Sequence, residues 1–162
     1  MAAADYFLKI DGVKGESHDD KHKGEIDLES WSWGESNSGA HASGGGGGAG
    51  KVSMQDFHFT MKINKASPEL MIGCATGKVF TKAVLTCRKA GGKQEEFFKV
   101  TMSDLLVSSF QTGGSAHGDV IPIDQISLNF SKIEYEYSPQ KADGTLDSPI
   151  KVGYDLKANK KV

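Results

Sequence analysis

The chain has 162 residues, a formal net charge of -2 and 25% charged residues. A chain of this length buries about two-thirds of its unfolded surface, so residues 1–162 can fold as a single domain without a disulfide or a metal. The nearly balanced charge argues against a nucleic-acid-binding protein. No apolar run approaches the roughly 18 residues of a membrane helix. The N-terminus lacks the basic and apolar segments of a secretory signal peptide, so we expect folding in the cytoplasm.

The first expected strand covers residues 6–10, where apolar side chains occupy every second position. The next apolar run, residues 25–36, is long, and its apolar residues change parity near the middle. Because side chains alternate strictly along a strand, this change requires a bulge, a sharp twist or burial on both faces. The same change recurs within residues 52–61 and 126–137.

Three long strands with a mid-course change of parity predict a strongly bent sheet. Further strands are expected at residues 79–88, 97–110 and 150–156, with turn residues between them. The predicted fold is therefore mainly β, a compact antiparallel β-barrel of two bent sheets. The changes of parity also indicate that the second face of the sheet is covered by another subunit. In the last strand, we expect inward positions for Ile150, Val152, Tyr154 and Leu156.

Residues 67–77 break the strand pattern and predict one short flanking helix. Ser67 is a suitable N-cap, Pro68 suits the first helical position and Gly77 is a typical helix end. The expected apolar face of this helix consists of Leu70, Met71, Cys74 and Ala75.

Residues 36–50 form a long loop rich in glycine and serine between two strands. Such a loop is too long for a tight hairpin and too flexible to keep one shape alone. It is therefore either mobile or ordered by a partner. The two cysteines, Cys74 and Cys87, have apolar neighbours and no CxxC spacing, so we expect free thiols in a reducing compartment.

Several patterns resemble functional motifs but do not complete them. Residues 45–51 fit the GxxxxGK part of a phosphate-binding loop, yet Val52 replaces the magnesium-binding hydroxyl and no helix follows. Ser108 has no nucleophile elbow and no matching histidine and aspartate spacing, so no hydrolase is expected. His58 is expected at a surface or interface position. A charged loop offers an incidental set of metal-binding side chains at His18, Asp19, Asp20 and His22.

The pair Trp31 and Trp33 is expected to anchor the core, because two tryptophans two residues apart share one face of a strand. Phe57 and Phe59 are expected to serve as further core anchors. Ser32 then projects from the opposite face, where a small polar side chain suits a wetted wall. The sequence thus indicates neither a catalytic set nor a cofactor or metal site.

Taken together and in this order, a set of short motifs resembles the Hcp (haemolysin-coregulated protein) family, the tube proteins of the type VI secretion system. The similarity extends over nearly the whole chain. The matching segments are residues 5–10, 12–17, 31–34, 50–51, Pro68, Leu70, 89–92, 107–109, 112–114, Tyr137, 139–144 and 153–155.

The resemblance implies a structural protein that is not an enzyme. Six copies would form a ring, and rings would stack into a tube inside a contractile sheath. The tube would be exported from the cytoplasm with a spike protein at its tip and small effector proteins in its lumen. Within this family, Ser32 is the candidate for a lumen-facing contact. The candidate stacking loop contains Ser38, Gly39, His41, Ser43, Gly46, Gly48, Gly50 and Lys51.

A monomeric barrel that binds a small molecule is the alternative from another class, since a closed barrel can hold one ligand. The large aromatic side chains argue against it, because they would fill the interior.

Overall fold

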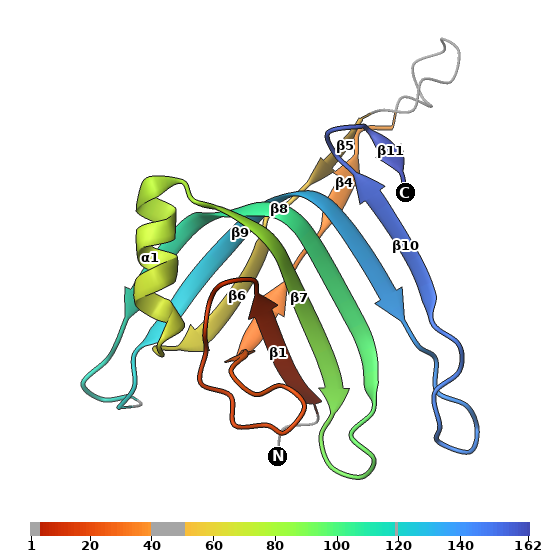
Figure 1. Ribbon diagram of the computed structural model, residues 1–162, viewed down its shortest axis with the longest axis horizontal. Coiled ribbons are helices and arrows are strands. Elements are labelled where there is room, and N and C mark those ends of the chain that lie inside the picture. The colour runs from red at the N-terminus through yellow and green to blue at the C-terminus, as the bar shows by residue number, and fades with distance from the viewer. Residues whose placement is uncertain (1–3, 40–50, 119) are drawn as a thin grey trace.

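Antiparallel strands make up most of the computed structural model, with one helix beside them (Figure 1). The structure describes residues 4–39, 51–118 and 120–162. In chain order the elements are β1 (Ala4–Ile10), β2 (Ile26–Asp27), β3 (Ser30–Ser32), β4 (Glu35–Asn37), β5 (Val52–Met54), β6 (Phe57–Lys62), α1 (Ala66–Thr76), β7 (Val79–Lys89), β8 (Glu96–Gly113), β9 (Ile123–Tyr137), β10 (Ile150–Asp155) and β11 (Lys160–Lys161).

The strands close into a barrel in the order β1, β7, β8, β9, β6 and β3, all antiparallel. The circuit is completed where the chain crosses from the edge of β1 to the edge of β6. Leu28 N donates to the Tyr6 carbonyl at 3.0 Å, and the next amide, Glu29 N, donates to the Thr60 carbonyl at 2.9 Å. Two hydrogen bonds from consecutive residues thus join opposite edges of one bent sheet.

The expectation of one continuous strand is wrong for residues 25–36, which form β2, β3 and β4, and for residues 52–61, which form β5 and β6. β2 pairs with β1, β3 pairs with β6, and β4 forms a separate two-stranded hairpin with β5. The change of partner occurs at the barrel closure. It explains why Ile26 and Trp31, which have opposite parity, both pack on the same core.

The change of parity within β9 has a different cause. Phe130 and Ile133 are both buried, although they belong to opposite parities. They lie opposite Leu105 and Met102 of β8, between which Asp104 has a φ of 50°. This φ is unusual for a residue with a side chain and interrupts the regular alternation. Both strands therefore change the face they bury at the same place.

The prediction of a short helix ending at Gly77 is confirmed, and Gly77 adopts the left-handed conformation with a φ of 67°. The predicted N-cap is wrong, since Lys65 precedes the helix and makes no side-chain cap. Ser67 lies in the first turn instead, where its hydroxyl donates to Asp124 Oδ2 of β9 at 2.6 Å. The predicted apolar face is wrong in part, because Met71 and Ala75 are exposed. The buried residues of α1 are Ala66, Ser67, Leu70 and Gly73.

The core fills the barrel, and its largest fully buried side chains include Phe57 and Phe59 from β6. Trp31 and Trp33 are half-buried and pack against this core. Trp31 stacks on Phe57 with ring centroids 6.1 Å apart. Both cysteines are free, and burial raises the pKa of the Cys87 thiol to about 12, which makes it unreactive.

Candidate functional site

One outer face of the barrel carries uncharged polar side chains in two rows. In the first row, Ser32 lies opposite His58, His58 opposite Ser127 and Ser127 opposite Ser109. The second row runs parallel to it across the same four strands, β3, β6, β9 and β8. We call these eight residues the polar wall: Ser30, Ser32, His58, Thr60, Ser109, Gln111, Gln125 and Ser127.

The polar wall follows from the alternation of side chains along β3 and β6. Trp31, Phe57 and Phe59 point into the core, so their neighbours Ser32 and His58 point outward. His58 Nδ1 lies 2.6 Å from Ser127 Oγ, which joins two strands of the wall. The wall lines a hollow of about 460 Å³, whose surface can hydrogen-bond a polypeptide without a strong charge.

A bulge between Val107 and Ser109 of β8 turns Ser109 onto the wall and leaves Ser108 beside it. The Ser108 hydroxyl donates to Asp56 Oδ2 at 2.6 Å, and Asn129 Nδ2 donates to the other carboxylate oxygen at 2.8 Å. Asp56 thus holds two strands together at the bulge. In the described part of the chain, Ser108 has no histidine among its hydrogen-bond partners.

The two lateral edges of the polar wall are open strands. Within the described residues, β3 has β6 as its only strand partner, and β8 beyond Leu106 has only β9. An open strand edge presents unpaired backbone groups that can pair with another chain.

The second unusual surface is apolar and lies at β10. The prediction that Ile150 and Val152 are covered is wrong, since they are 63% and 52% exposed, whereas Tyr154 and Leu156 are half-buried. Ile150 lies opposite Tyr137 of β9 and Val152 lies opposite Tyr135, and these two tyrosines are 45% and 44% exposed. We call Ile150, Val152, Tyr135 and Tyr137 the uncovered face.

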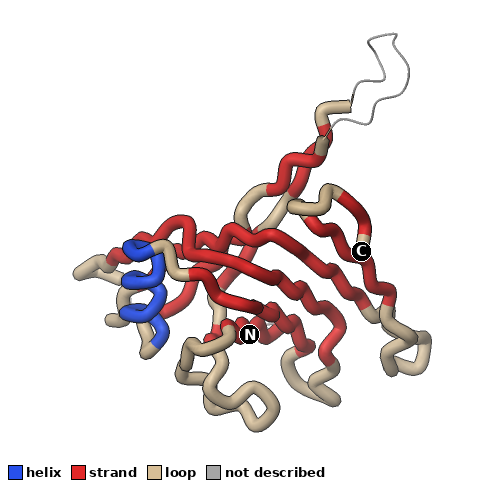
Figure 2. Tube along the Cα trace, turned by 45° about the horizontal axis from the view of Figure 1, so that its top comes forward, coloured by secondary structure: helices blue, strands red, loops and turns tan. Residues whose placement is uncertain are grey.

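The barrel closure explains why this face is uncovered. β6 pairs with the first half of β9, and β10 pairs with its second half, along the same edge. The barrel closes through β6 and β3, so β10 extends beyond the closed circuit and projects from its side (Figure 2). The side chains of β10 that point to the same side as the core residues therefore have no core to cover them.

The uncovered face borders the base of the β4–β5 hairpin, and the two enclose a groove of about 760 Å³. Exposed apolar surfaces of this kind mark association sites in soluble proteins. The apolar side chains that line the groove belong to Trp33, Val52, Met54, Ile133, Tyr135, Val152 and Tyr154.

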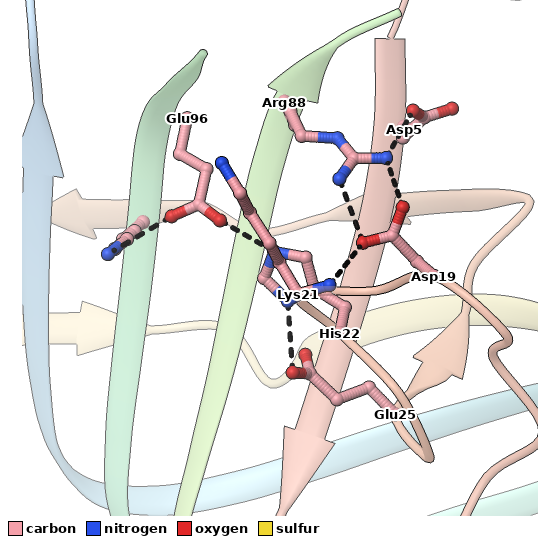
Figure 3. Close-up of polar contacts among 8 residues, drawn as sticks. Asp5, Asp19, Lys21, His22, Glu25, Arg88 and Glu96 are labelled. Carbon is pink, nitrogen blue, oxygen red and sulfur yellow. Dashed lines mark hydrogen bonds and ion pairs between the residues drawn. The ribbon is translucent and has the colours of Figure 1, made fainter. Parts of the chain in front are cut away.

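The charged segment that offered incidental metal ligands is instead tied into ion pairs (Figure 3). Asp19 binds the buried Arg88 guanidinium, and His22 lies between Glu25 and Glu96. His18 and Asp20 are exposed. Among the described residues, no three histidine, cysteine or carboxylate side chains are grouped closely enough to hold a metal ion.

The sequence alone does not reveal the roles of Arg88 and Glu96, because these residues meet Asp19 and His22 only in the folded chain.

The candidate stacking loop is described only at its two ends. Ser38 and Gly39 follow β4, and Lys51 precedes β5; all three are exposed. The remaining candidates lie outside the described residues: His41, Ser43, Gly46, Gly48 and Gly50.

No helix in the described parts of the chain is long and apolar enough to span a membrane. A family model described as "Type VI secretion system effector, Hcp" matches residues 7–137. Protein hcp1 of Pseudomonas aeruginosa is 52% identical to this chain over 159 residues, which cover 97% of this chain and 98% of that protein.

Solved structures agree with the sequence similarity. A structure described as that of a type six secretion system protein has a TM-score of 0.93 and 31% identity, and covers 99% of this chain and 100% of its own. Hcp1 from Salmonella typhimurium has a TM-score of 0.83 and 40% identity, with the same coverage.

Proposed function

The chain belongs to the Hcp family and is a tube subunit of the type VI secretion system, and we propose that six copies close into a ring whose inner surface is formed by their polar walls. Its role is structural and not enzymatic, and proteins of this family are secreted. In the proposed ring, the polar wall of each copy faces the lumen.

The uncovered face is the observation that carries this proposal. Its four large apolar side chains point to the same side of the sheet as core residues, but they lie exposed on an isolated chain. A copy of the same chain covers them in a closed ring, where one patch meets a different patch on the next subunit. The exposed apolar residues Met71, Ile72 and Val79 offer that second patch, because α1 lies on the opposite side of the fold from β10 (Figures 1 and 2).

The open edges of the polar wall support the same arrangement. Pairing of the β8 edge of one copy with the β3 edge of the next would continue the four-stranded wall around the ring. The lumen would then be lined by neutral hydrogen-bonding side chains. Such a lining suits passing cargo, because it neither repels nor tightly binds a charged protein surface.

We also propose that the rings assemble in the cytoplasm, stack inside the contractile sheath behind a spike protein, and carry small effector proteins. The β4–β5 hairpin supports stacking, since it projects from one end of the barrel (Figure 1). The interior of the barrel is filled by Phe57, Phe59 and other fully buried side chains, which disfavours a ligand-binding barrel.

Replacing Ser32 by glutamine is expected to impair cargo retention while rings persist. Ser32 is exposed on the polar wall, and each ring would carry six longer side chains in its lumen. The measurement is recovery of a co-expressed small type VI effector with purified rings. Thr81→Gln, an exposed change on β7 outside the wall, should retain the effector. Loss of the rings themselves in Ser32→Gln would show that Ser32 contacts another subunit.

Deletion of residues 40–50 is expected to leave rings that no longer form tubes. Asn37 pairs with Val52, so the deletion leaves Ser38, Gly39 and Lys51 as a three-residue loop, a length that hairpins tolerate. Electron microscopy and sedimentation report tube length and ring mass. A serine–glycine sequence of the original length serves as the control for loop length alone. Normal tubes from the deletion variant would contradict a stacking role.

A further inference from the structure

Residues 11–25 form a loop at the end of the barrel opposite the β4–β5 hairpin (Figure 1). The loop folds back on itself, with Gly15 N donating to the Gly24 carbonyl at 2.8 Å and Ser17 N to the Glu25 carbonyl at 3.0 Å. Two ionic contacts, one at Arg88 and one at His22, fasten it to the barrel.

The Arg88 contact is insensitive to pH near neutrality. Arg88 is only 3% exposed, and its two terminal nitrogens donate to the two Asp19 carboxylate oxygens at 2.9 and 2.8 Å. It also donates to Asp5 Oδ2 at 3.1 Å. Hydrogen bonding to this guanidinium lowers the pKa of Asp19 to about 2. Both partners therefore remain charged between pH 5 and 8.

The His22 contact behaves differently. His22 is 7% exposed, and its ring stacks on Phe7 with centroids 4.3 Å apart. Its Nδ1 lies 2.9 Å from Glu25 Oε2 in the loop, and its Nε2 lies 2.6 Å from Glu96 Oε1 in β8. A neutral imidazole carries one N–H and can donate to one carboxylate, whereas an imidazolium donates to both.

Glu96, the partner of His22 on β8, is held in its ionised form. Burial acts to raise the pKa of Glu96, but hydrogen bonding to His22 and the charge of Lys99, 3.4 Å away, outweigh it, so this pKa is lowered. Glu96 therefore stays ionised well below neutrality. The other charged side chains around the ring are Asp5 from β1, Arg88 from β7, Lys99 from β8, and Asp19 and Lys21 from the loop (Figure 3).

We propose that His22 is a pH-dependent latch, which fastens the 11–25 loop to β8 when its ring is doubly protonated and releases it when the ring is neutral. The docked loop then binds one more proton than the open loop. Docking therefore weakens as the pH rises. Release also uncovers Phe7, on which the His22 ring stacks.

The consequence for assembly rests on the proposed function. In a stack, the end that carries the 11–25 loop would meet the hairpin end of the next ring (Figure 1). A docked loop presents a fixed surface to that contact, and an open loop does not. Stacking is then favoured at mildly acidic pH.

Hydrogen exchange of the full-length protein tests the latch directly. Amides in residues 15–26 are compared at pH 5.5 and pH 8.0, after correction for the intrinsic exchange rate. Release of one proton limits the change in protection to about tenfold per pH unit. We expect protection to fall severalfold or more at the higher pH. Equal protection at the two pH values would overturn the proposal.

Three variants separate the latch from a merely structural histidine. His22→Gln should show low protection at both pH values, and His18→Gln, an exposed histidine in the same loop, should keep the wild-type dependence. Asp19→Asn should lower protection while keeping the dependence on pH. A dependence that survives in His22→Gln, or disappears in His18→Gln, would overturn the latch.

A parallel measurement separates the latch from its consequence for assembly. Sedimentation of the same samples reports ring mass and stacking at both pH values. Absence of rings at either pH would contradict the proposed function without affecting the exchange result. A pH-dependent loop in rings that stack equally at both values would contradict only the link to stacking.

Discussion

Val152→Asp is expected to convert rings into single chains without unfolding them. Val152 is 52% exposed on the uncovered face, so an aspartate there remains solvated in the isolated chain. In the proposed ring the same carboxylate is buried against an apolar neighbour, which costs several kcal/mol at each interface. A penalty of about 3 kcal/mol weakens subunit affinity about 100-fold. Mass photometry and circular dichroism report ring mass and folding separately.

Ala90→Asp is the matched control, because it places the same charge at an exposed position in the turn after β7, outside both proposed patches. It should leave both ring mass and thermal unfolding unchanged. Ile72→Asp should resemble Val152→Asp, since Ile72 belongs to the proposed opposite patch. Rings that persist in Val152→Asp would show that the uncovered face does not join subunits.

Phe57→Ala is expected to reduce the free energy of unfolding of one chain by about 3–5 kcal/mol. Phe57 is fully buried at the start of β6, and its ring packs between Trp31 and Phe59, with centroids about 6.1 Å from each. The substitution leaves a cavity beside the crossing that closes the barrel. Denaturant unfolding of the subunit under conditions that dissociate rings measures the loss.

Lys62→Ala, at the other end of the same strand, is the control. Its side chain is half exposed, and its one ion pair within the described part of the chain is a long 3.9 Å contact with Glu29. The free energy of unfolding should change by no more than about 0.5 kcal/mol. A loss in Phe57→Ala as small as in this control would contradict the role of Phe57 as a core anchor.

The sequence predicts most of the elements because alternation and turn residues are local signals. The strands at residues 6–10, 79–88 and 97–110 and the helix ending at Gly77 all occur in the structure. The change of parity within residues 25–36 correctly indicated a bent, closed sheet. Its cause, a transfer from β1 to β6, depends on long-range pairing that no local pattern contains.

The N-cap was mispredicted for a similar reason. Ser67 has the residue type of a helix cap, but its hydroxyl donates to the buried Asp124 of β9. A tertiary contact thus replaces the local one. The backbone of the first turn is served by Asn64, whose Oδ1 accepts from Ala66 N at 2.8 Å.

The candidate site could be predicted only in part. The position of Ser32 between Trp31 and Trp33 identified one outward position of the wall. The other members could not be assembled, because cross-strand register brings Ser32, His58, Ser127 and Ser109 side by side from four separate strands. The exposure of Ile150 was mispredicted because parity shows which face a side chain takes, not whether that face is covered.

Native mass spectrometry of the purified chain tests most directly whether the working unit is a closed assembly of copies. We expect a dominant species with six times the 17.4 kDa mass of one chain. A single 17.4 kDa species that persists at high protein concentration and low salt would contradict it.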